Sequence, residues 1–350
     1  MKKILKRKLL SYVYIFSLGI LSSFSLPPYN FFLINFFTFS ALFIFFVKQK
    51  FILTKTGYFL NGWIFGFGYF MSSLYWITIS LTFDQNFKIF IPIAFLLIPL
   101  FLAIFYGMAT NFFFFFKKFS NISLVLTFSA IFSISEFIRG NILSGFPWNL
   151  ISFSFSEFLP MLQILSFIGT YSFNLLCLSL FILPSFFYLK KEKYDIYFII
   201  SFILLIVSGL TYGQLKLNES EFASLKDNDF IIKIVSPKIK IERFYHTENE
   251  EEILKALIKL SEPDKKVKTI FVWPEGVFNN TEIDNLKNYQ SIFKEKFSKN
   301  HLIIFGINNS YYQNTFNSLA VVNNNLDVIE FYNKNNLVPF GEFLPLEAFL

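Results

Sequence analysis

Long runs of apolar residues alternate with short polar segments through the first 213 residues of the chain. A helix needs about 20 apolar residues to cross the hydrocarbon core of a bilayer. Seven runs approach or exceed that length: 9–26, 31–47, 57–82, 89–116, 122–138, 160–189 and 195–213. The pattern predicts a polytopic α-helical membrane domain with seven spans over residues 1–213.

The pattern changes from about residue 214, where charged residues become frequent and apolar segments shorten. Apolar runs of strand length predict five strands, at 230–235, 269–273, 302–306, 316–322 and 327–332, and the three asparagines at 323–325 predict a turn between the last two. Helical spacing predicts helices at 247–260 and 282–299. This order predicts an α/β domain with a mixed sheet over residues 214–350.

The basic residues of the membrane domain are unevenly divided between the two sides of the predicted helices. Thirteen lie in the N-terminal tail and in alternate loops, whereas the other loops hold only Lys88 and Arg139. Basic loops remain in the cytoplasm. The N-terminus is therefore predicted to be cytoplasmic and, after an odd number of spans, the α/β domain to be extracytoplasmic.

Composition narrows the function further. The net charge of +7 comes from clusters between apolar runs, which is not the single basic face typical of nucleic-acid binding. The lone cysteine, Cys177, excludes an intramolecular disulfide, and the two histidines lack ligand spacing. We therefore expect no metal, no cofactor and no nucleic-acid partner. A transporter is disfavoured because Glu136 and Arg139, the obvious charged pair near a span end, look interfacial.

Three segments of the α/β domain carry candidate chemistry. Glu275 follows an apolar strand and Trp-Pro, at the strand end where open α/β sheets bind ligands. Lys334 ends a Tyr-Asn-Lys segment, and Glu342 lies in the Pro-rich run 337–345. Each charge alone is more often a solvated surface residue.

Together these motifs resemble those of the nitrilase superfamily, most of all its membrane branch, the apolipoprotein N-acyltransferases. The Phe-Asn-Ser segment at 316–318 and the Gly-Phe-Pro-Trp segment at 145–148 also match that family. The resemblance covers nearly the whole chain. It implies a nitrilase-like αββα sandwich outside the inner membrane of a bacterium.

The resemblance also implies site roles. Glu275 would be the general base, Lys334 would stabilise the oxyanion, and Glu342 would support the site. A cysteine thiol would take an acyl chain from a phospholipid as a thioester and pass it to the N-terminal diacylglyceryl-cysteine of an apolipoprotein. Phe340, Phe146 and Trp148 would bind substrate, although Trp148 and its loop are equally well explained as an interfacial aromatic anchor. We expect Glu275 and Lys334 to lie side by side in a water-poor pocket.

The sequence departs from the family at the nucleophile. The family cysteine lies well beyond the lysine motif, and this chain ends sixteen residues after Lys334. Cys177 sits within an apolar run and is expected to be buried and inert. The chain is therefore expected to be a truncated or split product, or else a catalytically inactive membrane scaffold or binding protein with a degenerate nitrilase-like domain.

Overall fold

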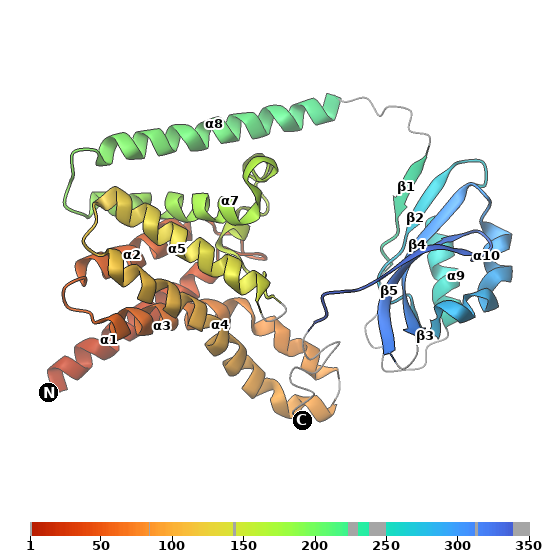
Figure 1. Ribbon diagram of the computed structural model, residues 1–350, viewed down its shortest axis with the longest axis horizontal. Helices are drawn as coiled ribbons and strands as arrows, with labels where there is room; N and C mark the ends of the chain where they lie inside the picture. Colours follow the sequence, from red (N-terminus) through yellow and green to blue (C-terminus); the bar gives the residue numbers. More distant parts are fainter. Residues whose placement is uncertain are drawn as a thin grey trace. The chain divides into compact units, whose positions relative to one another are not determined.

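The computed structural model describes residues 2–83, 85–142, 145–222, 230–237, 250–311 and 314–338. The chain divides into two compact units, Met1–Ala223 and Ser224–Leu350 (Figure 1). The first unit is helical and the second contains the sheet. The helix that begins at Asp195 continues to Phe222, so residues 214–222, which were predicted to begin the α/β domain, are helical.

Every apolar run of the first unit contains helix. The α-helices are α1 (Lys2–Ser23), α2 (Ile34–Lys48), α3 (Lys55–Ser73), α4 (Ile91–Phe113), α5 (Asn121–Asn141), α6 (Leu159–Leu162), α7 (Leu165–Ile182) and α8 (Asp195–Phe222). The 3-10 helices are η1 (Tyr75–Thr82), η2 (Gln85–Phe90), η3 (Phe114–Phe116), η4 (Ile151–Phe155) and η5 (Leu183–Phe187).

Four helical segments of the described chain are long and apolar enough to cross a membrane. A fifth arises if α3 and η1, which are bent by 46° relative to each other, form one span. The apolar parts of α1 and α2 are shorter. The protein is thus a multi-pass membrane protein by the length and composition of its helices.

The helical unit packs around aromatic side chains. Phe39, Phe65, Tyr106 and Phe128 are fully buried in one continuous cluster. Within this cluster α3 packs against α1 and α4, while α5 packs against α4 and α7. Thr54 caps the start of α3 by accepting a hydrogen bond from the Gly57 N–H.

The second unit is built on a mixed sheet. Its strands are β1 (Ile231–Ile234), β2 (Thr269–Val272), β3 (Phe278–Glu282), β4 (His301–Tyr311), β5 (Asn314–Asn323) and β6 (Val328–Asn333). The sheet order is β1-β2-β4-β5-β6, with β3 also paired to β4. The first three strands of this order run parallel and the β4-β5-β6 pairs are antiparallel, so the predicted mixed sheet is confirmed.

Helices cover one face of this sheet. α9 (Glu250–Ser261), η7 (Ile283–Tyr289) and α10 (Gln290–Lys296) follow β1 and β3 along the chain (Figure 1). Leu254 of α9 and Phe293 of α10 are buried with Phe271 and Trp273 from the sheet side. This layer supports the strand ends that carry the candidate site.

Two details of this unit differ from the prediction. The helix predicted at 282–299 is found as the 3-10 helix η7 followed directly by α10, and the strand β3 was not predicted. Tertiary contacts hold β3. The Thr281 hydroxyl donates to the Glu250 carboxylate on α9 at 2.6 Å, and β3 pairs with β4. Such contacts stabilise a strand that the residue pattern alone does not predict.

Candidate active site

Glu275 lies just after the carboxyl end of β2, and hydrogen bonds hold the backbone that leads to it. The Trp273 N–H donates to the Ile304 carbonyl at 2.8 Å, and its indole N–H donates to the Ser261 hydroxyl at 2.9 Å. The Gly306 N–H then donates to the Pro274 carbonyl at 3.3 Å. The backbone on both sides of the Trp-Pro step is therefore tied to β4 and α9.

Gly306 allows this close approach of β4 to the end of β2. A Cβ atom at position 306 would lie 2.8 Å from both the Glu275 Cα and the Gly276 N. Those contacts are with backbone, which has little room to move. Glycine at this position therefore lets Glu275 sit directly against the sheet.

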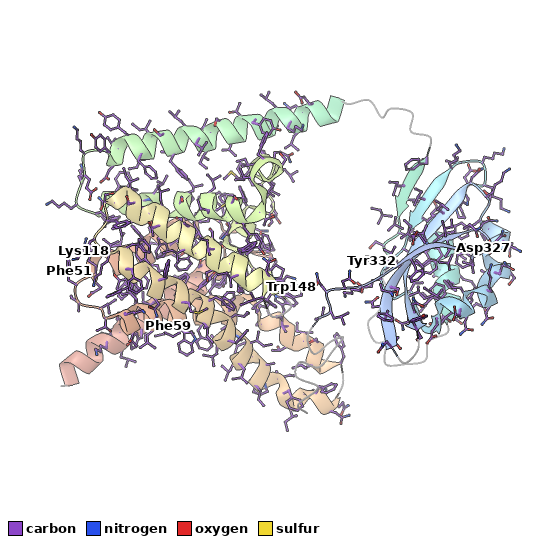
Figure 2. The ribbon with its side chains drawn as sticks, viewed as in Figure 1. Phe51, Phe59, Lys118, Trp148, Asp327 and Tyr332 are labelled. Atoms are coloured by element: carbon purple, nitrogen blue, oxygen red, sulfur yellow. The ribbon has the colours of Figure 1, made fainter. Side chains whose placement is uncertain are left out.

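Lys334 directly follows β6, the last strand in the sheet order. Its N–H donates to the Asn317 carbonyl at 2.8 Å, which extends the pairing of β5 with β6 by one residue. The preceding Asn333 accepts a hydrogen bond from the Ser318 hydroxyl at 2.6 Å. Tyr332, labelled in Figure 2, lies on the same strand.

The two predicted catalytic residues meet. Lys334 Nζ lies 3.5 Å from Glu275 Oε1. The Asn317 side-chain amide donates to the same oxygen at 2.6 Å. A carboxylate, an ammonium and an amide from three separate chain segments thus converge at one edge of the sheet.

Asn317 is a site residue that the sequence did not single out. It lies in the Phe-Asn-Ser segment that matched the family, but nothing in the sequence gave it a role. Its side chain contacts Glu275 and its carbonyl holds Lys334. The match of its Phe-Asn-Ser segment to the family was the available signal.

The pair is more open to solvent than expected. The Glu275 side chain is 67% exposed and that of Lys334 is 33% exposed. The expected water-poor pocket is therefore not found around these groups in the described part of the chain. Glu342 and Phe340, the other predicted residues of this unit, lie outside the described residues.

Phe146 and Trp148 lie in the loop of the helical unit that follows α5. Trp148 is labelled in Figure 2. Gly145 enters the loop with a φ of 77°, and the Phe146 N–H donates to the Arg139 carbonyl at 2.9 Å. The Trp148 ring, 48% exposed, stacks on Trp76 of η1 with ring centroids 5.0 Å apart. Of the two predicted substrate-binding aromatic residues, Phe146 is thus hydrogen-bonded through its backbone to α5, and Trp148 stacks on η1.

Glu136 and Arg139, which were expected to lie near the membrane interface, are enclosed within the helical unit. Both side chains are fully buried and form an ion pair with each other. The Tyr106 hydroxyl also donates to Glu136 Oε1 at 2.5 Å. Burial is tolerable because each charge has a charged and a hydrogen-bonding partner, which a sequence pattern does not reveal.

Cys177 is buried within α7, as expected. Cys177 has no solvent-exposed surface and packs in the core of the helical unit. A thiol in such apolar surroundings is a packing residue.

The chain resembles known proteins along almost its whole length. Residues 18–183 match the family described as the apolipoprotein N-acyltransferase N-terminal domain. Three relatives named apolipoprotein N-acyltransferase come from Rhizobium leguminosarum bv. trifolii, Rickettsia prowazekii and Wigglesworthia glossinidia brevipalpis, at 28%, 30% and 29% identity. Each alignment covers 95% of this chain, and the chain covers 65%, 66% and 65% of those relatives, respectively. The chain is thus similar to apolipoprotein N-acyltransferases along nearly its whole length, and it spans about 65% of the length of the relatives that it matches.

Proposed function

We propose that this chain carries the membrane domain and two catalytic residues of a phospholipid–apolipoprotein N-acyltransferase. The observation that carries the proposal is the convergence of Glu275, Lys334 and Asn317 at the sheet edge. These residues come from three segments, so their meeting is a property of the fold rather than of any one motif. Acyl transfer through a thioester needs a base and a positive charge together, and this site supplies both.

In the proposed first half-reaction, Glu275 takes the proton of a cysteine thiol. Its Oε1 is engaged by Lys334 and Asn317, so Oε2 is the oxygen assigned to proton transfer. The thiolate attacks the ester carbonyl of a phospholipid, and the Lys334 ammonium stabilises the resulting oxyanion. The lysophospholipid leaves with the proton from Glu275, and an acyl thioester remains.

In the second half-reaction, the α-amine of a diacylglyceryl-cysteine attacks the thioester. An N–C bond forms, the C–S bond breaks, and the thiol is regenerated. Glu275 carries the amine proton to the leaving sulfur. Glu342 supports the site, while Phe340, Phe146 and Trp148 contact the lipid substrates.

The mechanism needs an accessible thiol beside Glu275. Cys177 does not meet this requirement, because it is enclosed in the core of the helical unit. The proposal therefore gives this chain the base and the oxyanion residue, and requires a further cysteine at the site.

The location follows from the substrates and the charge pattern. We propose seven spans in the helical unit, with the N-terminus in the cytoplasm of a bacterium. The second unit, Ser224–Leu350, would be a nitrilase-like αββα domain on the periplasmic side of the inner membrane. The thirteen basic residues of the N-terminal tail and alternate loops support this orientation, since of the two basic residues assigned to the other loops Arg139 is buried within α5 and only Lys88 remains. A site there meets acyl chains without extracting them from lipid, which would cost about 0.8 kcal/mol per CH₂ group.

The test measures transfer of a labelled acyl chain from phospholipid to a diacylglyceryl lipopeptide, with the protein expressed from its own gene and the downstream sequence retained. Glu275→Gln and Lys334→Met are expected to lower the rate by about 100-fold or more. Glu330→Gln on β6 and Lys294→Met on α10 change exposed charges and should leave the rate unaltered. Equal rates in all four variants would refute the assignments. Lipopeptide binding without any transfer would instead favour the inactive scaffold.

A further inference from the structure

A buried ion pair in the helical unit reaches the loop that carries Trp148. Arg139 Nη2 pairs with the Glu136 carboxylate within α5. The other terminal nitrogen, Nη1, donates to the carbonyls of Phe146 at 2.5 Å and of Trp148 at 2.8 Å. One guanidinium thus joins α5 to two points of the loop.

Stability alone does not account for this arrangement. A buried ion pair is often no more stabilising than apolar residues of the same volume. The buried pair of Glu136 and Arg139 does fix the orientation of the guanidinium group. Because that group is planar and rigid, it holds its hydrogen-bond partners in a fixed geometry. The Tyr106 hydroxyl from α4 fixes Glu136 in turn.

The C-terminal end of the loop, at Asn149, is hydrogen-bonded to α3. The Tyr69 hydroxyl donates to the Asn149 carbonyl at 3.0 Å, and the Asn149 side-chain amide donates to the Ser73 carbonyl at 3.2 Å. Trp76 follows directly on η1, and its indole N–H donates to the same Ser73 carbonyl at 3.1 Å. The loop is therefore held from α5 on one side and from the end of α3 on the other.

The product of these contacts is an exposed aromatic surface. The Trp76 and Trp148 rings are stacked at an interplanar angle of 26°, and they are 40% and 48% exposed. Tyr75 and Ile79 on η1 are also about half exposed and extend the apolar surface. We call the stacked rings of Trp76 and Trp148 the indole shelf.

We propose that Arg139, oriented by Glu136, is a positioning residue that fixes Trp148 against Trp76 so that the indole shelf receives the acyl chain of a phospholipid. This rests on the proposed function for the identity of the lipid. A flat aromatic pair with apolar neighbours suits a hydrocarbon chain, which it contacts by dispersion along its length. The hydrogen bonds from Arg139 Nη1 to the Phe146 and Trp148 carbonyls hold the loop backbone, from which the Trp148 ring extends to its stacking partner.

The test uses protein in which Trp63→Phe and Trp273→Phe leave Trp76 and Trp148 as the two remaining tryptophans of the four. Stacked indoles couple to give an exciton signal in circular dichroism, which Trp148→Phe should abolish. Arg139→Met is expected to abolish the same signal. Arg139→Lys keeps the charge but lacks the fork, so it should lose most of the signal while retaining the helical content.

A matched control separates positioning from general destabilisation. Phe128→Ala empties part of the buried aromatic core on the same helix, away from the loop. It should lower thermal stability yet keep the exciton signal. An unchanged signal in Arg139→Met, or equal losses in Phe128→Ala and Arg139→Met, would overturn the positioning role.

Lipid contact is read separately, by quenching of the two indoles with phospholipid brominated on the acyl chain. Strong quenching in the parent protein that falls in Arg139→Met is expected. Quenching that does not exceed that by headgroup-labelled phospholipid would overturn the acyl-chain assignment. Neither readout requires turnover, so a failed transfer assay and a failed shelf are distinguishable.

Discussion

Asn317 shows how much of the candidate active site depends on a single side chain. Its amide binds Glu275 Oε1 and its backbone carbonyl binds the Lys334 N–H. The amide hydrogen bond fixes which carboxylate oxygen faces Lys334. The largest effects of substitution are therefore expected among the neighbours of the charged residues as well as at the charges themselves.

Replacing Asn317 should impair acyl transfer without unfolding the sheet. Asn317→Ala removes one hydrogen bond to a charged group, worth about 1.5–3 kcal/mol, so the rate should fall by about 10-fold or more. Asn317→Asp should be worse, because it places a second carboxylate beside Glu275. Asn314→Ala, exposed on the same strand, is the control for both variants in the transfer assay. A rate for Asn317→Ala equal to that control would show that Glu275 needs no such support.

An ion pair between Lys287 and Asp327, in the turn after β5, should make the stability of the α/β unit depend on pH. A hydrogen bond from Lys287 lowers the pKa of Asp327 below its usual 3.8. Because the folded-state pKa is the lower one, the stabilisation is present above the unfolded pKa and is lost as the pH falls through the folded value. Lys287→Met should lower the thermal unfolding temperature slightly at pH 7, and the difference from the parent protein should shrink below about pH 4. A difference that grows with acidity would contradict this assignment.

At the scale of elements, the site is a junction between β2, β4, β5 and β6. The parallel strands bring Glu275 to the carboxyl end of β2, and the antiparallel pair carries Lys334 back to the same edge. The junction closes because β4 passes the end of β2 without a side chain at Gly306. Element packing therefore sets the separation of the two charges.

Gly306→Ala should displace Glu275. The new Cβ would lie 2.8 Å from backbone atoms of Glu275 and Gly276, so the end of β2 must shift. Overpacking of this kind costs about 1–3 kcal/mol, and we expect the transfer rate to fall by more than the stability loss alone explains. Rates are compared at a temperature where circular dichroism shows both proteins folded. Wild-type transfer by the alanine variant would mean that the catalytic geometry tolerates the shift.

At the scale of the whole molecule, the chain is a multi-pass membrane protein joined to an α/β unit. Four helical segments of the described chain have the length and composition of spans, or five with the bent α3–η1 pair. The proposed seven spans further require that α1 and α2, whose apolar parts are shorter, also cross. An odd total places the N-terminus and the α/β unit on opposite sides.

Single cysteines in a Cys177→Ala background test this orientation. Lys118→Cys lies in a loop assigned to the cytoplasm, and Lys266→Cys lies on the exposed surface of the α/β unit. A maleimide that cannot cross membranes, added to intact spheroplasts, should label position 266 and spare position 118 until the membrane is lysed. Labelling of both positions from the same side would exclude the proposed topology.

The sequence by itself determined the architecture, because apolar length, charge placement and short-range periodicity are local properties. The helical unit, the mixed sheet with its β5–β6 hairpin, and the motifs around Glu275 and Lys334 were all visible in this way. Tertiary structure decided which polar groups meet. The pairing of β5 brought the Asn317 side chain to Glu275, and helix packing enclosed Arg139 together with Glu136. Such contacts join residues far apart in the chain. They form only when particular polar atoms are desolvated and paired with one another, and a local residue pattern does not contain that information.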